Sequence, residues 1–458
     1  MKKLPFLILL QATLGCSALF AQADPYAGYT NTSSYFLPYS SGSFTPNNGG
    51  DVFVSFSLPE STGTKTNFNV QVDTGSRGFY SSSTALGAAF TNADSYAGQI
   101  GLSSSGRVFQ GYWTPTIMTF NVTNLATGLA DMVTSSVTVL DVQSLTCDSN
   151  HASATFTTTT DSGTVIANII GTTNTTTLLF TGGSVTVNQG LSVSYALNTN
   201  LANEENFGVG FYLGEATNST TTGPIANNKN QTYNPLINLT SSNLVAGYIV
   251  KTNGIQLGLA TNVSGYAYTK LNSTGLTSSN SVPDWQTPMG TTVINGVTNT
   301  PGSIVMDSGI SNAYISASNL VTAPTNFTVQ LMNSGGATNG GVGYNINMGS
   351  NSALNPSAID LSNSGTNGIF SQNASPYGYS YFNTGRNVFD AFNMLYDAQN
   401  GYMGLLTNDY GSSLVGNGTV FFSAQAGGFP NPVPEPSAIA LFGLGGLVLL
   451  AVCRRKQV

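Results

Sequence analysis

The sequence predicts an all-β fold of two lobes within one chain of 458 residues, with few and short helices. Three observations lead to this prediction. Apolar and polar residues alternate with a period of two in several segments, which is typical of half-buried antiparallel strands. Clusters of Gly, Asn and Ser separate these segments, in a chain that has 52 glycines. One strand-and-turn pattern recurs at a distance that suits two lobes, and no long amphipathic helical pattern stands out.

The first predicted strand covers residues 52–58, where apolar residues alternate with mostly polar ones. The same pattern covers residues 185–197, on either side of a turn at 188–190. A Thr-rich stretch within 152–183 predicts an insertion of polar-faced strands, to which we assign no chemistry. Predicted loops rich in Gly, Asn and Ser lie at 47–50, 334–341 and 349–355.

Residues 1–23 have the features of a secretory signal peptide. Two lysines precede an apolar stretch from Leu4 to Leu14, and Ala21-Gln22-Ala23 forms a small-residue cleavage site. Cys16 offers the alternative of a lipoprotein signal, but the apolar stretch before it would be short. We therefore expect cleavage after Ala23 and export of the chain.

Residues 429–458 form a second addressing segment. Val433-Pro434-Glu435-Pro436-Ser437 precedes an apolar run at 438–453, and three basic residues follow. This order resembles the PEP-CTERM sorting tail of Gram-negative bacteria, which implies handling by an exosortase-type enzyme, transient membrane contact through residues 438–453 and an outer-surface or extracellular location. The alternative is a plain membrane anchor, but 16 residues are few against the roughly 20 of a spanning helix.

Charge and composition exclude several classes of function. Without both addressing segments the chain keeps 7 basic and 18 acidic residues, a net charge of −11, which disfavours nucleic acid as a partner. Cys147 is the only cysteine outside those segments, so no internal disulfide is expected there. His151 is the only histidine, which excludes a multi-histidine metal site, and we expect neither metal nor cofactor. Residues 148–150 predict a surface turn between Cys147 and His151.

The motif that points to chemistry occurs twice. An alternating apolar strand ends in Asp73-Thr74-Gly75-Ser76, and a second ends in Asp307-Ser308-Gly309, 234 positions further on. One such motif also describes an ordinary turn. Two copies on matching strands instead suggest that Asp73 and Asp307 face each other, share one proton and act together as acid and base.

The paired motifs resemble the catalytic loops of the pepsin-like aspartic proteases. Further segments are similar to that family at 206–211, 235–250 and 385–405. The resemblance implies a bilobal double β-barrel, with an N-terminal lobe at 24–245 and a C-terminal lobe at 246–428. It also implies that Asp73 and Asp307 are the catalytic residues.

Small neighbours are expected to support this pair. Gly75 and Gly309 let two loops approach each other, Thr74 and Ser308 are candidate interlocking hydroxyls, and Ser76 is expected to orient Asp73.

The flap of the family, a hairpin over the cleft, is expected near residues 103–113. Its candidate residues are Gly106, Gly111, Tyr112 and Trp113.

The sequence departs from the family in several places. The aligned position of the flap tyrosine falls among serines, and Arg77 directly after Ser76 is unusual. Ile310 stands where a hydroxyl residue usually bonds the second aspartate, and Tyr80 stands where a tryptophan is common. Asn383 and Thr384 precede Gly385, where the family prefers two apolar residues.

Two functions follow from these observations. The first is an exported aspartic endopeptidase that hydrolyses an extended polypeptide in acid. The alternative is a catalytically inactive protein of the same fold that binds at the cell surface or in a biofilm matrix.

Overall fold

The computed structural model describes residues 26, 30–408 and 421–422, with gaps of which the longest are 148–154, 197–204, 211–232, 317–325, 333–341, 348–358 and 362–379. The described residues form an all-β structure, which confirms the predicted fold class. Their helices, α2 (Ser83–Leu86) and α3 (Asn387–Ala391), are short. The predicted signal peptide and sorting tail lie outside the described residues. Within the described part, no helix has the length and hydropathy needed to span a membrane.

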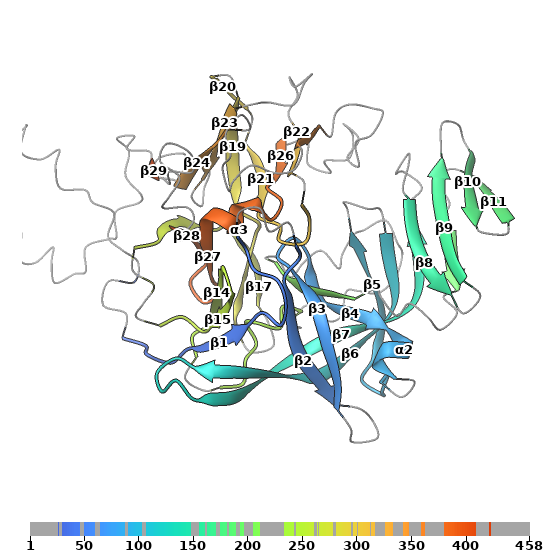
Figure 1. Ribbon diagram of the computed structural model, residues 1–458, viewed down its shortest axis with the longest axis horizontal. Coiled ribbons are helices and arrows are strands. Elements are labelled where there is room, and N and C mark those ends of the chain that lie inside the picture. The colour runs from blue at the N-terminus through green and yellow to red at the C-terminus, as the bar shows by residue number, and fades with distance from the viewer. Residues whose placement is uncertain are drawn as a thin grey trace, which may run out of the picture.

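The strands follow one another closely along the chain (Figure 1). Those before residue 210 are β1 (Tyr35–Pro38), β2 (Phe53–Pro59), β3 (Lys65–Asp73), β4 (Arg77–Ser82), β5 (Tyr96–Leu102), β6 (Arg107–Asn124), β7 (Ala130–Cys147), β8 (Thr155–Thr160), β9 (Gly163–Ile170), β10 (Thr175–Phe180), β11 (Gly183–Asn188), β12 (Val193–Ala196) and β13 (Asn206–Val209). Those after it are β14 (Gly247–Lys251), β15 (Gly254–Leu257), β16 (Ala267–Lys270), β17 (Ser273–Thr277), β18 (Pro283–Trp285), β19 (Met289–Ile294), β20 (Val297–Thr298), β21 (Gly302–Val305), β22 (Ala313–Ser316), β23 (Asn326–Leu331), β24 (Val342–Asn347), β25 (Ile359–Leu361), β26 (Ser380–Asn383), β27 (Phe392–Asp397), β28 (Tyr402–Thr407) and β29 (Phe421–Phe422).

Among the described residues, the largest sheet joins both halves of the chain. Its order runs β12, β7, β4, β13, β3, β2, β6, β1 and then β15, β14, β27, β28, β16, with β5 paired to β6. A second sheet has the order β25, β22, β26, β21, β19, β23, β24, β29, with β20 paired to β19. The predicted boundary between 245 and 246 falls just before β14, a strand of the sheet that both halves share, and the domain limits stay a prediction.

The strands around the two aspartate motifs repeat one pairing pattern. β2 pairs antiparallel with β3, β3 parallel with β13, β13 antiparallel with β4, and β4 parallel with β7. β19, β21, β26, β22 and β25 follow the same series of antiparallel and parallel pairings. We call these two sets the first repeat and the second repeat. In each repeat the aspartate motif follows a strand, β3 or β21, that pairs in parallel with a strand from later in the chain, β13 or β26.

A hydrophobic core with members from both repeats supports the motif strands. On β2, Val54, Phe56 and Leu58 are buried and alternate with more exposed residues, as the sequence predicts. Phe56 packs against Phe68 of β3 and Phe207 of β13, with ring centroids 5.5 and 5.2 Å apart. This packing fixes the end of β3, and with it the start of the first motif.

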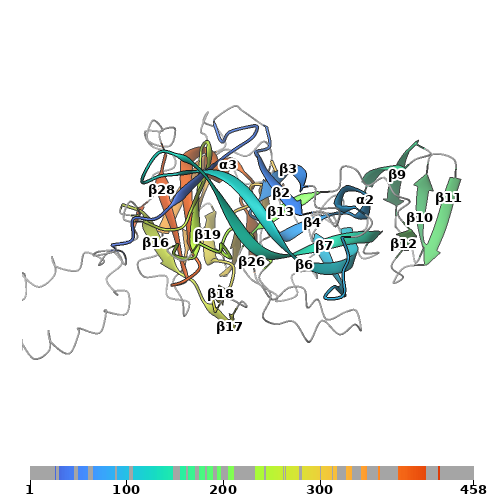
Figure 2. The ribbon, with the colours of Figure 1, turned by 90° about the horizontal axis from the view of Figure 1, so that it is seen from below.

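Two features extend beyond the repeated pattern. β7 of the first repeat forms a long antiparallel hairpin with β6, which extends well beyond the other strands of that repeat (Figure 2). β8 to β11, in the Thr-rich stretch, form a four-stranded sheet that stands apart from the other sheets (Figures 1 and 2). The four-stranded sheet carries no residue of the candidate site, whereas β6 carries the flap candidates Gly111, Tyr112 and Trp113.

Candidate active site

The structure brings the two predicted aspartates together. Asp73 is the last residue of β3, and Asp307 lies two residues after β21. Val72 and Met306, the residues before them, are buried, so both strand ends are anchored in the core. Asp307 is buried with 7% of its surface exposed, whereas Asp73 is half-buried. The pair therefore lies where the two repeats meet.

Thr74 and Ser308 interlock the two motif loops. The Thr74 backbone N–H donates to Ser308 Oγ at 3.0 Å, and the Ser308 N–H donates to Thr74 Oγ1 at 3.0 Å. Each hydroxyl then donates into the opposite strand, Thr74 to the Met306 carbonyl at 2.6 Å and Ser308 to the Val72 carbonyl at 2.7 Å. Both side chains are buried, so these four bonds are shielded from water. The arrangement joins the repeats directly behind the carboxyl groups.

The motif glycines leave room for the opposite carboxyl group. A Cβ atom on Gly309 would lie 2.7 Å from Cγ of Asp73, and one on Gly75 would overlap the carboxyl group of Asp307. No real Cβ tolerates such contacts, so any larger residue would push a carboxyl group away. The glycine N–H groups also donate to the aspartate of their own loop, Gly75 to Asp73 Oδ1 at 2.8 Å and Gly309 to Asp307 Oδ1 at 2.9 Å.

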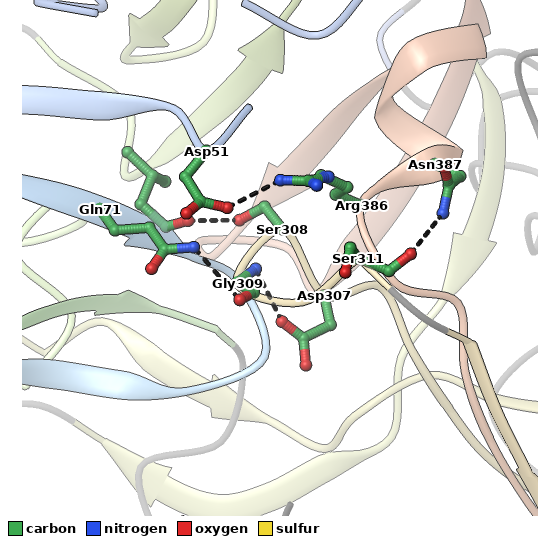
Figure 3. A network of polar contacts seen from close by, with 9 residues as sticks. Asp51, Gln71, Asp307, Ser308, Gly309, Ser311, Arg386 and Asn387 are labelled. Atoms are coloured by element: carbon green, nitrogen blue, oxygen red, sulfur yellow. Dashed lines mark hydrogen bonds and ion pairs between the residues drawn. The ribbon is translucent and has the colours of Figure 1, made fainter. Parts of the chain in front are cut away.

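Polar contacts around the second motif add further links between the repeats (Figure 3). The Gln71 side-chain amide, on β3, donates to the Gly309 carbonyl at 3.1 Å. Arg386, just before α3, forms an ion pair of 2.7 Å with Asp51, just before β2. The Arg386 backbone N–H also donates to the Ile310 carbonyl at 2.8 Å. The second motif loop is thus held from both sides.

Two asparagines that the sequence analysis did not assign to the site contact the carboxyl groups. Asn206, the first residue of β13, donates from Nδ2 to Asp73 Oδ2 at 2.9 Å and to Ser76 Oγ at 2.6 Å. Asn383, the last residue of β26, donates from Nδ2 to Asp307 Oδ2 at 2.7 Å. Ser76 therefore lies next to the amide that holds Asp73. The Ile310 side chain has no hydrogen-bond donor for Asp307, and Asn383 supplies one from β26.

The sequence did contain a signal for these asparagines. Each begins an Asn-x-Gly triplet: Asn206-Phe207-Gly208 lies in a segment that resembles the protease family, and Asn383-Thr384-Gly385 leads into another such segment. Against the family alone, the second triplet is only a departure from an apolar pattern. Comparison of the two triplets with each other would have identified the pair.

Burial and charge act together on Asp307. Its burial, and then the negative charge of Asp73 and a hydrogen bond shared with it, raise the pKa of the Asp307 carboxyl well above its usual range. Hydrogen bonds from Asn383 and the Gly309 N–H oppose this rise. Two carboxyl groups so placed can share one proton. One member can then donate a proton while the other accepts one.

The predicted flap coincides with a hairpin of β5 and β6. Gly106 lies outside the described residues. Gly111 faces β7 at an irregularity in the register, where a Cβ would collide with the Asp141 carbonyl, so a side chain has no room there. Tyr112 is 44% exposed, whereas Trp113 is buried against Gly98 and Tyr233.

The aromatic residue at position 80 contacts the same hairpin. The Tyr80 ring stacks on Phe109 of β6, with centroids 4.4 Å apart, and both residues are buried. Tyr96, at the start of β5, places its hydroxyl 3.1 Å from that of Tyr233. The base of the hairpin is therefore packed by aromatic side chains.

No group of three or more His, Cys, Asp or Glu suited to a metal ion occurs among the residues that the structure describes. The carboxyl groups of Asp73 and Asp307 instead receive their donors from backbone N–H groups and side-chain amides. These donors suit a pair that binds and releases protons.

Comparison with known proteins identifies one part of the chain. Residues 432–456 match the PEP-CTERM protein-sorting motif, which confirms the predicted sorting tail. No curated protein matches the chain. The motif marks the chain as an exported protein that an exosortase recognises and sorts.

Proposed function

We propose that this protein is an exported aspartic endopeptidase of the pepsin-like type, which cuts extended polypeptide at the surface of a Gram-negative bacterium. The observation that supports this most strongly is the placement of each carboxyl group against the glycine of the opposite loop. Two acidic groups are rarely buried together without a function, because like charges destabilise each other. The sorting motif agrees with a surface location, with transient membrane contact through residues 438–453.

The environments of the two carboxyl groups assign their roles. Asp307 is the more buried and has the raised pKa, so it holds the proton and acts as the acid. Asp73 is the base, which takes a proton from a water molecule as the water oxygen attacks the peptide carbonyl carbon. Asp307 gives its proton to the carbonyl oxygen, which yields a tetrahedral intermediate. Its collapse breaks the C–N bond: Asp73 gives the proton that it took from water to the leaving amine nitrogen, and Asp307 takes back a proton from a hydroxyl group of the intermediate.

This assignment predicts activity confined to acidic pH. Asp307 must keep its proton, so activity falls as the pH rises through the pKa of that group. Thr74, Ser76 and Ser308 act as supports in this scheme and do not react.

The test is proteolysis by the purified mature chain. An unfolded protein substrate should be cleaved in acid and not at neutral pH, and Asp73→Asn and Asp307→Asn should each lose at least 100-fold in kcat. Asn408→Leu, at a buried asparagine whose side chain donates to the backbone carbonyls of Phe389 and Asp390, is the matched control. Cleavage that persists in both aspartate variants would exclude this mechanism.

A second candidate function is a catalytically inactive protein of the same fold, which binds peptide or glycan at the cell surface or in a biofilm matrix. Ile310, in place of a hydroxyl residue, favours it. A statine-containing peptide separates the two candidates, since it mimics the tetrahedral intermediate and binds a competent pair. Tight binding at acid pH supports the endopeptidase, and absence of binding supports the inactive protein.

A further inference from the structure

We propose that Asn206 and Asn383 are equivalent positioning residues, one in each repeat, whose side-chain amides hold the second oxygen of each aspartate. This inference rests on the proposed function, because it assigns a role in the same site. It goes further by identifying an amide pair in place of the hydroxyl support expected from the sequence.

The strand register establishes the equivalence. In the first repeat Gly208 lies opposite Asp73, so Asn206 stands two residues before that position. In the second repeat Asn383 lies opposite Val305, so Gly385 corresponds to Asp307 and Asn383 again stands two residues earlier. The same residue therefore occupies the same place in both repeats. Coincidence is a poor explanation for two buried amides placed alike.

Neighbouring groups fix the orientation of the Asn383 amide. The Gly385 backbone N–H donates to Asn383 Oδ1 at 2.9 Å. A backbone N–H only donates, so the oxygen of the amide must face it and Nδ2 must face Asp307. Asn383 is buried, with 3% exposed, and its contact with Asp307 Oδ2 is therefore shielded from water.

Asn206 uses both of its amide hydrogens at the site. One is donated to Asp73 Oδ2 and the other to Ser76 Oγ, so the side chain cannot rotate without losing a bond. Asn206 is buried as well, with 7% exposed. The Ser76 hydroxyl accepts a hydrogen bond from the Asn206 amide and so helps to hold that amide in place. Ser76 would therefore orient Asp73 through Asn206.

The result is one donor for each of the four aspartate oxygens. Glycine N–H groups bond the Oδ1 atoms, and the asparagine amides bond the Oδ2 atoms. Donors of this kind stabilise an ionised carboxylate. The asparagines therefore offset the burial that disfavours ionisation, and they keep the pair able to exchange a proton in acid.

Other charged groups near the site are already engaged. Glu205, next to Asn206, accepts a hydrogen bond from Ser81 at 3.0 Å, and Arg386 pairs with Asp51. Arg77 opens β4 directly after the first motif. The charge that raises the pKa of Asp307 comes from Asp73. The hydrogen bond from Asn383 acts against the effect of that charge on the pKa of Asp307.

The test replaces each amide by leucine, which has a similar volume and no donor. Asn383→Leu should raise the pKa of Asp307 and move the alkaline limb of the pH profile to higher pH. Asn206→Leu should lower kcat more than it changes KM, because the Asp73 carboxyl group loses a donor that holds its position. Each variant should lose about tenfold in kcat/KM at the wild-type optimum, mostly in kcat. Asn408→Leu, the buried control, should keep the wild-type kcat/KM and leave the alkaline limb in place.

Asn383→Asp keeps the shape of the side chain in case the leucine variant does not fold. The new carboxyl group can donate to Asp307 only while it is protonated, and once ionised it raises the pKa of Asp307 further, so the alkaline limb of this variant should also move to higher pH. An alkaline limb that stays in place in both Asn383 variants, or an unchanged kcat in Asn206→Leu, would overturn the inference.

A titration that needs no activity separates this inference from the proposed function. Carbon-13 NMR of labelled aspartate follows the Asp307 carboxyl in wild type and in Asn383→Leu. A titration that moves to higher pH in the variant supports the positioning role, even if the wild type cleaves nothing. An unchanged titration overturns the role, even if the wild type is an active protease.

Discussion

Replacing Thr74 by valine tests the interlock between the repeats. Valine keeps the shape of threonine but removes Oγ1, which accepts from the Ser308 N–H and donates to the Met306 carbonyl. Both backbone groups then stay buried without these partners, at a cost of about 1 to 3 kcal/mol each. Partial relaxation reduces the sum, and we expect Thr74→Val to lower the free energy of unfolding by about 3 kcal/mol.

Thr291 provides a matched control. It is also a buried threonine, with 2% exposed, but its Oγ1 has no hydrogen-bond partner in the described part of the chain. Thr291→Val should therefore be neutral or stabilising. Urea unfolding measures both variants, and an unchanged m-value shows that the comparison is one of stability alone. Equal effects of the two substitutions, or a loss below about 0.5 kcal/mol for Thr74→Val, would refute the reasoning.

Two further predictions concern the carboxyl pair and pH. Gly309→Ala should displace Asp73 by roughly 1 Å and reduce kcat by about 100-fold, measured on an unfolded substrate in acid. Gly128→Ala, where a Cβ meets no atom but φ is +71°, should lose about 1 kcal/mol of stability and keep full activity; equal activity losses would contradict this. Burial raises the pKa of Asp390 to about 8, against a lowering effect of Arg386. The folded protein then binds a proton that the unfolded chain releases, so stability falls as the pH rises from about 4 to 8. Asp390→Asn should remove this fall and be more stable at pH 7 by about 2 kcal/mol in urea unfolding; an unchanged slope would contradict it.

Much of the fold was predictable from local patterns. Alternation in 52–58 and before Asp73 reflects a period-two burial that the structure reproduces, because each strand has one face in the core. The closeness of Asp73 and Asp307 followed from the repetition of a whole motif. The contacts of Thr74 and Ser308 followed from the need of two loops for small hydroxyl residues between them.

The remaining features depend on register, which short patterns do not contain. Asn383 differs from an apolar family preference, and its equivalence to Asn206 becomes visible only when both parallel pairings are aligned. Trp113 was a flap candidate because it follows the expected turn. Its burial depends instead on Gly98 and Tyr233, the second of which is distant in sequence and packs under the same hairpin.

The exchange of hydroxyls between Thr74 and Ser308 also has a consequence for biosynthesis. Each motif loop is completed by hydrogen bonds from the other loop. Of the residues that donate to the two carboxyl groups, Asn383 is synthesised last. A chain still threading through the export machinery thus lacks the assembled pair. Any chemistry of these carboxyl groups therefore requires that both motif loops have been exported and have folded together.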